Sequence, residues 1–229
     1  MTSKKMIQIA IDGPAASGKS TAARTLAERL GGYYVNTGDM YRTVAWAALQ
    51  AGIDPDADPG AVVAKLPEWD LRLQAEGGVL QLILNDVPVQ QAAIRAPEVA
   101  AVVSQVARIP EVRDWMLSRQ RDCRHLGIII MEGRDIGTVV LPDATCKFFI
   151  TASPEERARR RLQQAGEVAP SATLASVAAD IAERDRIDST RAVAPLKPAD
   201  DAEIFVTDGM EKEEVAELLI AAIKRKTGL

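Results

Sequence analysis

A glycine- and lysine-bearing segment near the N-terminus has the spacing of a phosphate-binding loop. Gly13, Gly18, Lys19 and Ser20 occupy every fixed position of the pattern G-x-x-x-x-G-K-[ST]. The two glycines let successive backbone N–H groups turn toward a polyphosphate, while the lysine reaches its β- and γ-phosphates and the serine hydroxyl ligates Mg²⁺. We therefore expect ATP and Mg²⁺ to be bound by Gly13, Pro14, Ala15, Ala16, Ser17, Gly18, Lys19, Ser20 and Thr21.

The loop predicts a phosphate site but not a reaction. A regulatory GTPase needs a guanine-reading N-K-x-D segment, and the sequence has none. An ATP-driven motor usually carries an apolar strand that ends in an acidic pair, whereas the run 128–131 ends in Glu132 alone. Two interpretations of Glu132 stay open: it holds a Mg²⁺-bound water, or it is a solvated glutamate at the end of a strand.

Arginines gather in predicted loops and at the beginnings of helices. Transfer of phosphate between nucleotides requires the donor and acceptor phosphates to be held in line and their charge neutralised. Arginine suits this task because its planar guanidinium binds phosphate through two hydrogen bonds and stays charged. Taken singly, each arginine is more consistent with a weak surface ion pair. Together they favour an acceptor-phosphate site and a lid; they are Arg42, Arg113, Arg134, Arg157, Arg159, Arg160, Arg161, Arg184, Arg186 and Arg191.

The elements that must position these residues alternate between short apolar strands and amphipathic helices. Such alternation is typical of an α/β fold with a parallel sheet. Strands are predicted at 7–11, 33–35, 127–131, 146–150 and 203–206, and helices at 19–30, 39–51, 154–164, 173–187 and 211–226. We predict a five-stranded parallel sheet with helices on both faces, the fold of a P-loop kinase.

The stretch from about residue 69 to 97 breaks the alternation. Two apolar runs, 69–74 and 79–84, flank Gly77-Gly78, which is typical of an antiparallel hairpin. A second turn and a short Pro88-Val89 segment follow. We therefore predict a core formed by residues 1–64 and 98–229, with a helical lid at about 154–170 and an inserted antiparallel β module at 65–97.

The composition limits the classes of partner. Apolar residues make up 47% of the 229-residue chain, which suits a globular core, and a net charge of −4 argues against nucleic-acid binding. The N-terminus leads almost directly into the apolar run 6–11, which is too short and too interrupted to be a secretory or membrane segment. Cys123 and Cys146 lack metal-type spacing, and His125 is the single histidine. We expect a cytoplasmic monomer with reduced thiols and no histidine-rich metal site.

Several segments outside the phosphate loop carry recognisable motifs. They are Thr37-Gly38, Met40-Tyr41-Arg42, Ser104-Gln105-Val106-Ala107, Glu132-Gly133-Arg134-Asp135-Ile136-Gly137-Thr138 and Arg191-Ala192-Val193-Ala194-Pro195-Leu196. With Asp12-Gly13-Pro14 and Gly18-Lys19-Ser20, they resemble those of the bacterial cytidylate kinases, within the nucleoside monophosphate kinases. The resemblance spans nearly the whole chain, and the last two motifs are its most specific part. The module at 65–97 also resembles the enlarged acceptor-binding module of that family.

The resemblance implies a reaction and the residues that carry it. It implies transfer of the γ-phosphoryl group of ATP to CMP or dCMP, in pyrimidine nucleotide metabolism; Ser20 and Glu132 are the candidate residues for Mg²⁺. It implies acceptor-binding roles for Thr37, Tyr41, Arg42, Ser104, Arg113, Arg134, Asp135, Arg184, Asp188 and Arg191. Among these, Ser104, Arg113 and Asp135 would read the base, and Arg184 and Asp188 would contact the ribose. The catalytic set would be Lys19, Arg134, Arg157, Arg161 and Arg191, with Arg157 and Arg161 closing over the ATP phosphates from the lid.

The chemistry of the base supports the base-reading set. Cytosine presents an amino donor beside a ring-nitrogen acceptor, and a carboxylate paired with an arginine complements both. Uracil has a carbonyl oxygen, which is an acceptor, in place of the amino donor. An unpaired polar group in such a pocket costs about 1–3 kcal/mol, enough for roughly ten- to hundredfold discrimination. The alternatives are a kinase for UMP, AMP or a sugar-like acid, and a nucleotide-binding regulator or RNA-binding protein. The acidic composition and the missing guanine motif weigh against the last two.

The sequence departs from the family pattern in four places. Asn36 stands where a carboxylate is common, Asp39 where a small residue is usual, and Glu132 where some relatives have aspartate. Ile187 interrupts a run that is usually more polar. None of these changes removes a donor that the reaction needs, but together they leave the surroundings of the metal open.

Overall fold

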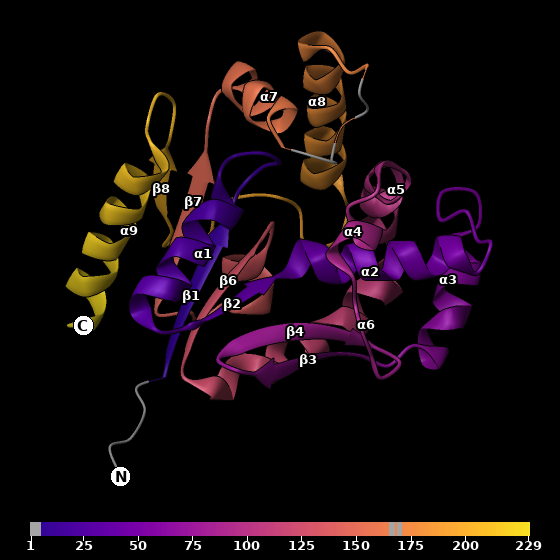
Figure 1. Ribbon diagram of the computed structural model, residues 1–229, viewed down its shortest axis with the longest axis horizontal. Coiled ribbons are helices and arrows are strands. Elements are labelled where there is room, and N and C mark those ends of the chain that lie inside the picture. Colours follow the sequence, from indigo (N-terminus) through magenta and orange to yellow (C-terminus); the bar gives the residue numbers. More distant parts are fainter. Residues whose placement is uncertain (1–5, 165–167, 169–170) are drawn as a thin grey trace.

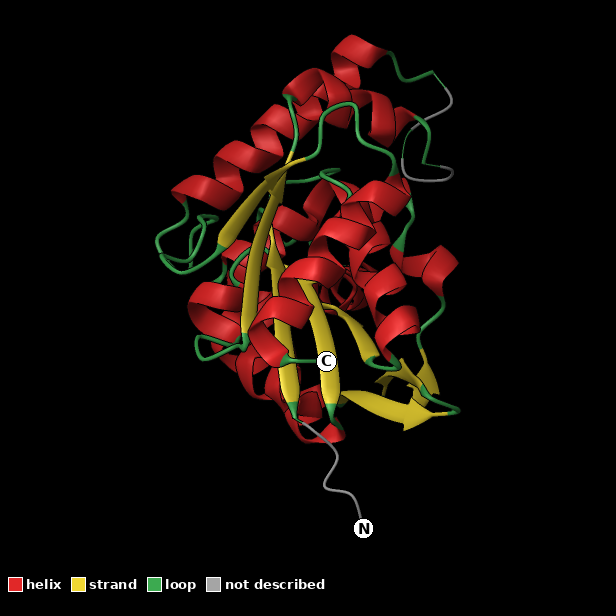
Figure 2. Ribbon diagram, turned by 90° about the vertical axis from the view of Figure 1, so that its left-hand side faces the viewer, coloured by secondary structure: helices red, strands yellow, loops and turns green. Residues whose placement is uncertain are grey.

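The computed structural model describes residues 6–164, 168 and 171–229, and a five-stranded parallel sheet lies at its centre (Figures 1 and 2). The strands are β1 (Ile7–Asp12), β2 (Tyr33–Asn36), β6 (Ile128–Gly133), β7 (Cys146–Thr151) and β8 (Glu203–Val206), in the spatial order β2-β6-β1-β7-β8. In the middle of the sheet, Ile9 of β1 lies opposite Ile130 on one side and Cys146 on the other. The predicted five-stranded parallel sheet is confirmed.

Helices cover the sheet on both faces because the central strand is apolar on both. Ile7, Ile9 and Ile11 pack with α1 (Lys19–Leu30) and α9 (Lys212–Thr227), whereas Ala10 faces the opposite cluster. The helices α2 (Thr37–Gln50), α5 (Pro97–Arg108) and α6 (Pro110–Arg121) lie on the other side of the sheet from α1 and α9 (Figure 1). A strand buried on both faces is the usual centre of a parallel sheet.

The predicted antiparallel segment forms a separate three-stranded sheet. It consists of β3 (Leu71–Glu76), β4 (Val79–Leu84) and β5 (Val87–Pro88), in that order, after α3 (Pro59–Lys65) and a short 3₁₀ turn (Leu66–Glu68). Figure 1 shows the hairpin lying along α2 and α6. Its Leu71 belongs to the same buried cluster as Val44 of α2 and Met116 of α6, and α4 (Gln91–Ile94) leads back into α5.

Two helices form a pair above the carboxyl ends of the strands (Figure 1). They are α7 (Pro154–Leu162) and α8 (Leu174–Thr190), which share an apolar cluster centred on Ala158, Val177 and Ile181. Thr173 and Ser176 form a reciprocal cap at the start of α8. Of the lid predicted at 154–170, residues 165–167 and 169–170 lie outside the described residues, as do residues 1–5 of the predicted core.

Some helix boundaries differ from the sequence prediction. Helix α2 begins at Thr37 rather than at residue 39, because the Asn36 side chain accepts a hydrogen bond from the Asp39 N–H at 3.1 Å and caps the helix. Helix α8 continues to Thr190 rather than 187, and α7 ends at Leu162 rather than 164. The helices α3, α5 and α6 had no predicted boundaries.

Candidate active site

The phosphate-binding loop joins β1 to α1 and depends on its two glycines. Gly13 has φ +148°, and a Cβ there would lie 2.0 Å from the Ile150 carbonyl oxygen of the neighbouring strand β7. Gly18 adopts a left-handed conformation with φ +91° immediately before α1. No L-residue fits the space at Gly13, so the sequence pattern reflects a close approach between two backbones.

Lys19 folds back across the loop that carries it. Its Nζ donates to the Pro14 carbonyl at 2.7 Å and to the Ser17 hydroxyl at 3.4 Å, and the side chain is buried. Burial above all, with the neighbouring Arg134 guanidinium, lowers the pKa of Lys19 to about 7, although Glu132 and Asp12 act in the opposite direction. A polyphosphate against the loop would give this ammonium a strong acceptor and raise its pKa.

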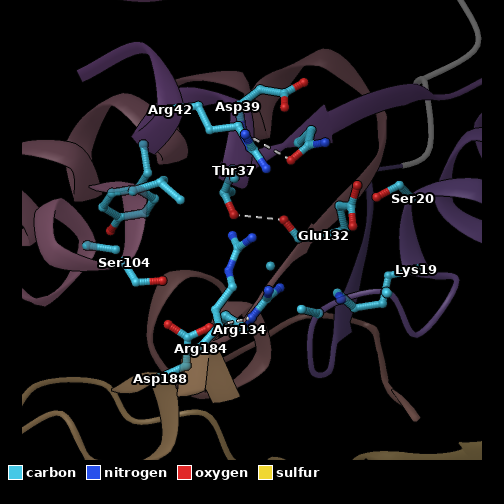
Figure 3. A pocket seen from close by; sticks show the side chains of 18 of the residues that line it. Lys19, Ser20, Thr37, Asp39, Arg42, Ser104, Glu132, Arg134, Arg184 and Asp188 are labelled. Carbon is cyan, nitrogen blue, oxygen red and sulfur yellow. Dashed lines mark hydrogen bonds and ion pairs between the residues drawn. The ribbon is translucent and has the colours of Figure 1, made fainter. Parts of the chain in front are cut away.

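A single cavity connects the loop with the arginine-rich segments (Figure 3). One wall is formed by Ala15 to Thr21 of the loop and α1, and the others come from α2, α5, the end of β6 and α8. The predicted acceptor-binding residues Thr37, Tyr41, Arg42, Ser104, Arg113, Arg134, Asp135, Arg184, Asp188 and Arg191 all line it, together with Ser20, Glu132 and Arg161. Residues as far apart in the sequence as Ala15 and Arg191 thus surround one space.

Asp135, which lines this cavity, lies between two arginines. Its Oδ2 accepts from Nη2 of Arg113, and its Oδ1 accepts from Nη2 of Arg191 at 3.3 Å. Arg113 also donates to the Ala107 carbonyl at 3.1 Å, and its guanidinium lies over the Tyr41 ring. All three charged side chains are buried, so their orientations are fixed by each other and by the backbone of α5.

A second carboxylate, Asp188, organises the adjoining wall. It accepts from Nε of Arg134 at 2.9 Å and lies 3.9 Å from Arg191. Burial raises the pKa of Asp188, but the guanidinium groups of Arg134, Arg184 and Arg191 together hold that pKa below its usual range. Figure 3 shows Arg134, Arg184 and Asp188 on the same side of the cavity, facing Thr37.

Glu132 and Ser20 face each other at the loop end of the cavity (Figure 3). Glu132 ends β6, is buried, and accepts from the Tyr34 hydroxyl at 2.5 Å, while its backbone carbonyl accepts from Thr37 Oγ1 at 2.7 Å. Among the described residues there is no group of three or more His, Cys, Asp or Glu side chains placed to hold a metal. A hydroxyl and one carboxylate suit a hard cation that keeps most of its ligands from water and phosphate, as Mg²⁺ does.

Arg42 and Asp39 connect α2 to the returning end of the antiparallel segment. Arg42 is buried and donates from Nη1 to the Ile94 carbonyl at 3.2 Å. The Asp39 carboxylate pairs with Arg95 at 2.6 Å and accepts from the Gln91 amide at 3.3 Å. Burial raises the pKa of Asp39, against the effect of Arg95. No motif in the sequence marks Arg95 as a site residue.

The two lid arginines predicted from the sequence, Arg157 and Arg161, differ in whether they line the cavity. Arg161 lines the cavity. Arg157 is not among the lining residues; its Nη1 donates to the Ala15 carbonyl at 3.2 Å and to Asp185 at 2.5 Å, and its Nε donates to the Ala152 carbonyl. Direct contact between Arg157 and a nucleotide would therefore require it to leave these partners.

Asp12 is a further residue of the site for which the sequence indicated no role. Its carboxylate accepts from the backbone N–H groups of Ile136 and Gly137, both at 2.7 Å. Burial raises the pKa of Asp12 to about 6, although the two backbone hydrogen bonds lower it. The bonds tie the strand that leads into the phosphate loop to the turn that carries Arg134 and Asp135. Its place directly before Gly13 was the only signal in the sequence.

Comparison with known proteins agrees with this arrangement. The family model for cytidylate kinase matches residues 9–225. The chain belongs to the cytidylate kinase family. It is 47% identical over 216 residues to a cytidylate kinase of Pelotomaculum thermopropionicum, covering 94% of this chain and 95% of that protein.

Other relatives of the family carry a second activity. The chain is 47% identical over 222 residues to a bifunctional pantoate ligase/cytidylate kinase of Synechococcus sp., covering 95% of this chain but only 45% of that protein.

Among solved structures, the crystal structure of TT1252 from Thermus thermophilus aligns with 98% of this chain and 99% of its own chain, with 19% identity and a TM-score of 0.47. No helix among the described residues is both long and apolar enough to cross a membrane.

Proposed function

We propose that this chain transfers the γ-phosphoryl group of ATP to CMP, giving CDP and ADP, and that dCMP is also an acceptor, giving dCDP. Family membership supports the kinase activity and the acceptor class. The structural observation that carries the proposal is the buried Asp135, held between Arg113 and Arg191 in a cavity that the phosphate loop also lines.

This arrangement favours cytosine as the base. A carboxylate oxygen of Asp135 can accept from the exocyclic amino group, and Arg113 or Ser104 can donate to the ring nitrogen and the carbonyl oxygen. Uracil would present a carbonyl oxygen to the carboxylate, which leaves two acceptors facing each other. The fixed orientation of Asp135 makes that mismatch difficult to relieve.

The remaining acceptor contacts follow from the positions of the arginines. Arg42, Arg134 and Arg191 would surround the acceptor phosphate, with the hydroxyls of Thr37 and Tyr41 beside them. Arg184 and Asp188 would contact the ribose, where the carboxylate can accept from the sugar hydroxyls. No general base is needed, because an acceptor phosphate oxygen is already anionic near neutral pH.

The donor would lie on the phosphate loop. The loop N–H groups from Ala16 to Thr21 would hold the ATP phosphates, and Lys19 would exchange the Pro14 carbonyl for a phosphate oxygen. A second cavity beside Gly18, lined also by Arg160, Thr207 and Val215, offers a place for the adenosine. Arg161 would approach the transferring group from the lid, and the same role for Arg157 stays a prediction.

Mg²⁺ is the metal that the residues fit. Ser20 would ligate it directly and Glu132 would hold one of its waters, and the bound ion would screen the negative charge of the β- and γ-phosphates. The shared position of both side chains at the loop end of the cavity supports this assignment.

The setting and organisation of the enzyme are part of the proposal. We infer a cytoplasmic monomer that acts in pyrimidine nucleotide metabolism on nucleotides, without nucleic-acid or membrane partners. We also infer that residues 65–97 act as an inserted acceptor-binding module on the core of residues 1–64 and 98–229. The bond from Arg42 to the Ile94 carbonyl supports this last inference, because it connects the returning end of the insertion with the acceptor site.

The test is ADP release by the purified protein with ATP and Mg²⁺, with CMP, dCMP, UMP, AMP and GMP added separately. We expect strong turnover with CMP and dCMP, much weaker turnover with the others, and little ATP hydrolysis without an acceptor. Preference for another acceptor would overturn the roles of Ser104, Arg113 and Asp135. A lack of turnover with all five would overturn the proposed reaction.

A further inference from the structure

Helix α8 makes two kinds of contact at neighbouring positions. Arg184 and Asp188 line the cavity proposed for the acceptor. Asp185, one position after Arg184, instead contacts the phosphate loop, where its Oδ1 accepts from the Ala15 N–H at 3.3 Å. A single turn of helix thus contacts both the proposed acceptor site and the loop that would hold the donor.

Arg157 of α7 completes a ring of hydrogen bonds with Asp185 and Ala15. Oδ2 of Asp185 accepts from Nη1 of Arg157 at 2.5 Å, and the same Nη1 donates to the Ala15 carbonyl at 3.2 Å. The N–H and the C=O of Ala15 are therefore both bound by the helix pair, one by the carboxylate and one by the guanidinium. Ala15 and Arg157 are buried, and Asp185 is the carboxylate paired with Arg157.

We propose that Asp185 is a positioning residue that couples the acceptor site to the phosphate loop. The proposal rests on the phosphoryl-transfer function proposed above. An acceptor that binds Arg184 and Asp188 restrains α8, and through Asp185 the restrained helix fixes Ala15 and Arg157 in the arrangement that transfer requires. Asp185 itself touches neither nucleotide.

The chemistry of the contact explains why a carboxylate is needed. The two carboxylate oxygens of Asp185 each bind one donor, the Ala15 N–H and the Arg157 guanidinium, and the negative charge strengthens the second of these bonds. Asparagine keeps an acceptor for Ala15 but loses the charge that orients Arg157. Alanine loses both contacts and leaves a buried guanidinium without its carboxylate.

Removal of the coupling is expected to slow transfer more than it weakens acceptor binding. In Asp185→Ala we expect kcat to fall about ten- to a hundredfold, with a change of less than about threefold in the KM for CMP. In Asp185→Asn we expect a smaller fall in kcat. We also expect the fraction of ATP hydrolysed to phosphate, rather than used to form CDP, to increase. Glu183→Gln, which removes an exposed carboxylate from the same helix, is the matched control and should leave kcat and KM unchanged.

A double-mutant cycle with Arg157→Ala separates coupling from a general loss of structure. If the two residues act as a unit, Asp185→Ala should reduce kcat only slightly further in a chain that already carries Arg157→Ala. Additive losses, a rise in KM for CMP that matches the fall in kcat, or full activity of Asp185→Ala would each overturn the proposal. If Asp185→Ala does not fold, the same cycle is run with Asp185→Asn. Failure of the wild-type chain to turn over any acceptor would instead contradict the proposed function.

Discussion

Arg113 and Asp135 form a buried ion pair that lines the cavity, and the other carboxylate oxygen of Asp135 accepts from Arg191 at 3.3 Å. Arg113 comes from α6 and Asp135 from the turn after β6, so the pair also joins two elements of the core. In this buried site each charged group holds the other in a fixed orientation, because burying either group without its partner would cost free energy.

Asp135→Ala should relax the choice of base. We expect kcat/KM for CMP to fall about ten- to a hundredfold while kcat/KM for UMP changes much less, since the lost hydrogen bond is specific to the cytosine amino group. Steady-state rates with both acceptors measure the ratio. The substitution also leaves two buried guanidinium groups without this carboxylate, so thermal unfolding should be recorded beside the kinetics. An unchanged CMP-to-UMP ratio in a folded variant would contradict the base-reading role.

The fold was predictable wherever the sequence carries a signal at both ends of a helix or strand. Helix α1 begins and ends as predicted, because the phosphate loop precedes it and Gly31, with φ +62°, ends it. Strand β8 also matches its predicted limits. The helices α5 and α6 were not delimited, because only Ile109 separates them and neither has a side-chain cap. Their junction is set by tertiary packing of Ile109 and Val112 in the cluster around α2.

The site was predictable by residue type but not by side-chain direction. The sequence places Arg157 and Arg161 on one face of a helix, and only the packing of α7 against the loop decides that Arg161 lines the cavity and Arg157 does not. Asp12 and Asp185 went unassigned for a related reason. Asp12 binds the backbone N–H groups of Ile136 and Gly137, and Asp185 binds that of Ala15 as well as Arg157; a backbone partner leaves no residue type in the sequence to recognise.

Gly13→Ala should disrupt the phosphate loop. The added Cβ would lie 2.0 Å from the Ile150 carbonyl oxygen, and the positive φ adds strain, so either the loop or strand β7 must move. We expect ATP binding to be lost and the melting temperature to fall. Gly60→Ala in α3, where the nearest atom is 3.5 Å away, should leave both unchanged or raise stability by up to about 1 kcal/mol. Equal behaviour of the two variants would contradict the close approach.

Asp12 should make stability depend on pH. Because burial raises the pKa of Asp12 to about 6, the folded state binds a proton more tightly than the unfolded state does. Its contribution to stability is therefore full below about pH 4 and is lost as pH rises through about 6. We expect the free energy of unfolding of the wild type, relative to Asp12→Asn, to decrease by about 3 kcal/mol in total from about pH 3 to about pH 7. Chemical unfolding of both proteins across this range measures the difference, and parallel curves would contradict the shift.

Glu132→Gln should weaken the response to Mg²⁺. Glutamine keeps an acceptor for the Tyr34 hydroxyl but loses the charge that would orient a metal-bound water. We expect the Mg²⁺ concentration for half-maximal activity to rise about ten- to a hundredfold, with little change in thermal stability. Glu155→Gln, an exposed site at the start of α7, is the control. An unchanged Mg²⁺ dependence would favour the alternative in which Glu132 serves only the structure around Tyr34 and Thr37.

Lys19 should couple nucleotide binding to proton uptake. Since burial lowers the pKa of Lys19 to about 7 in the free protein, part of the population is neutral at neutral pH, and a polyphosphate favours the charged form. ATP binding should therefore take up protons and weaken as pH rises from about 7 to 9, until the pKa of the complex is passed. Calorimetric titrations in two buffers of different ionisation enthalpy measure the uptake. Lys19→Met should bind ATP more weakly and abolish the pH dependence in this range. Binding that is constant from about pH 7 to 9 in the wild type would show that Lys19 is fully charged before the nucleotide arrives.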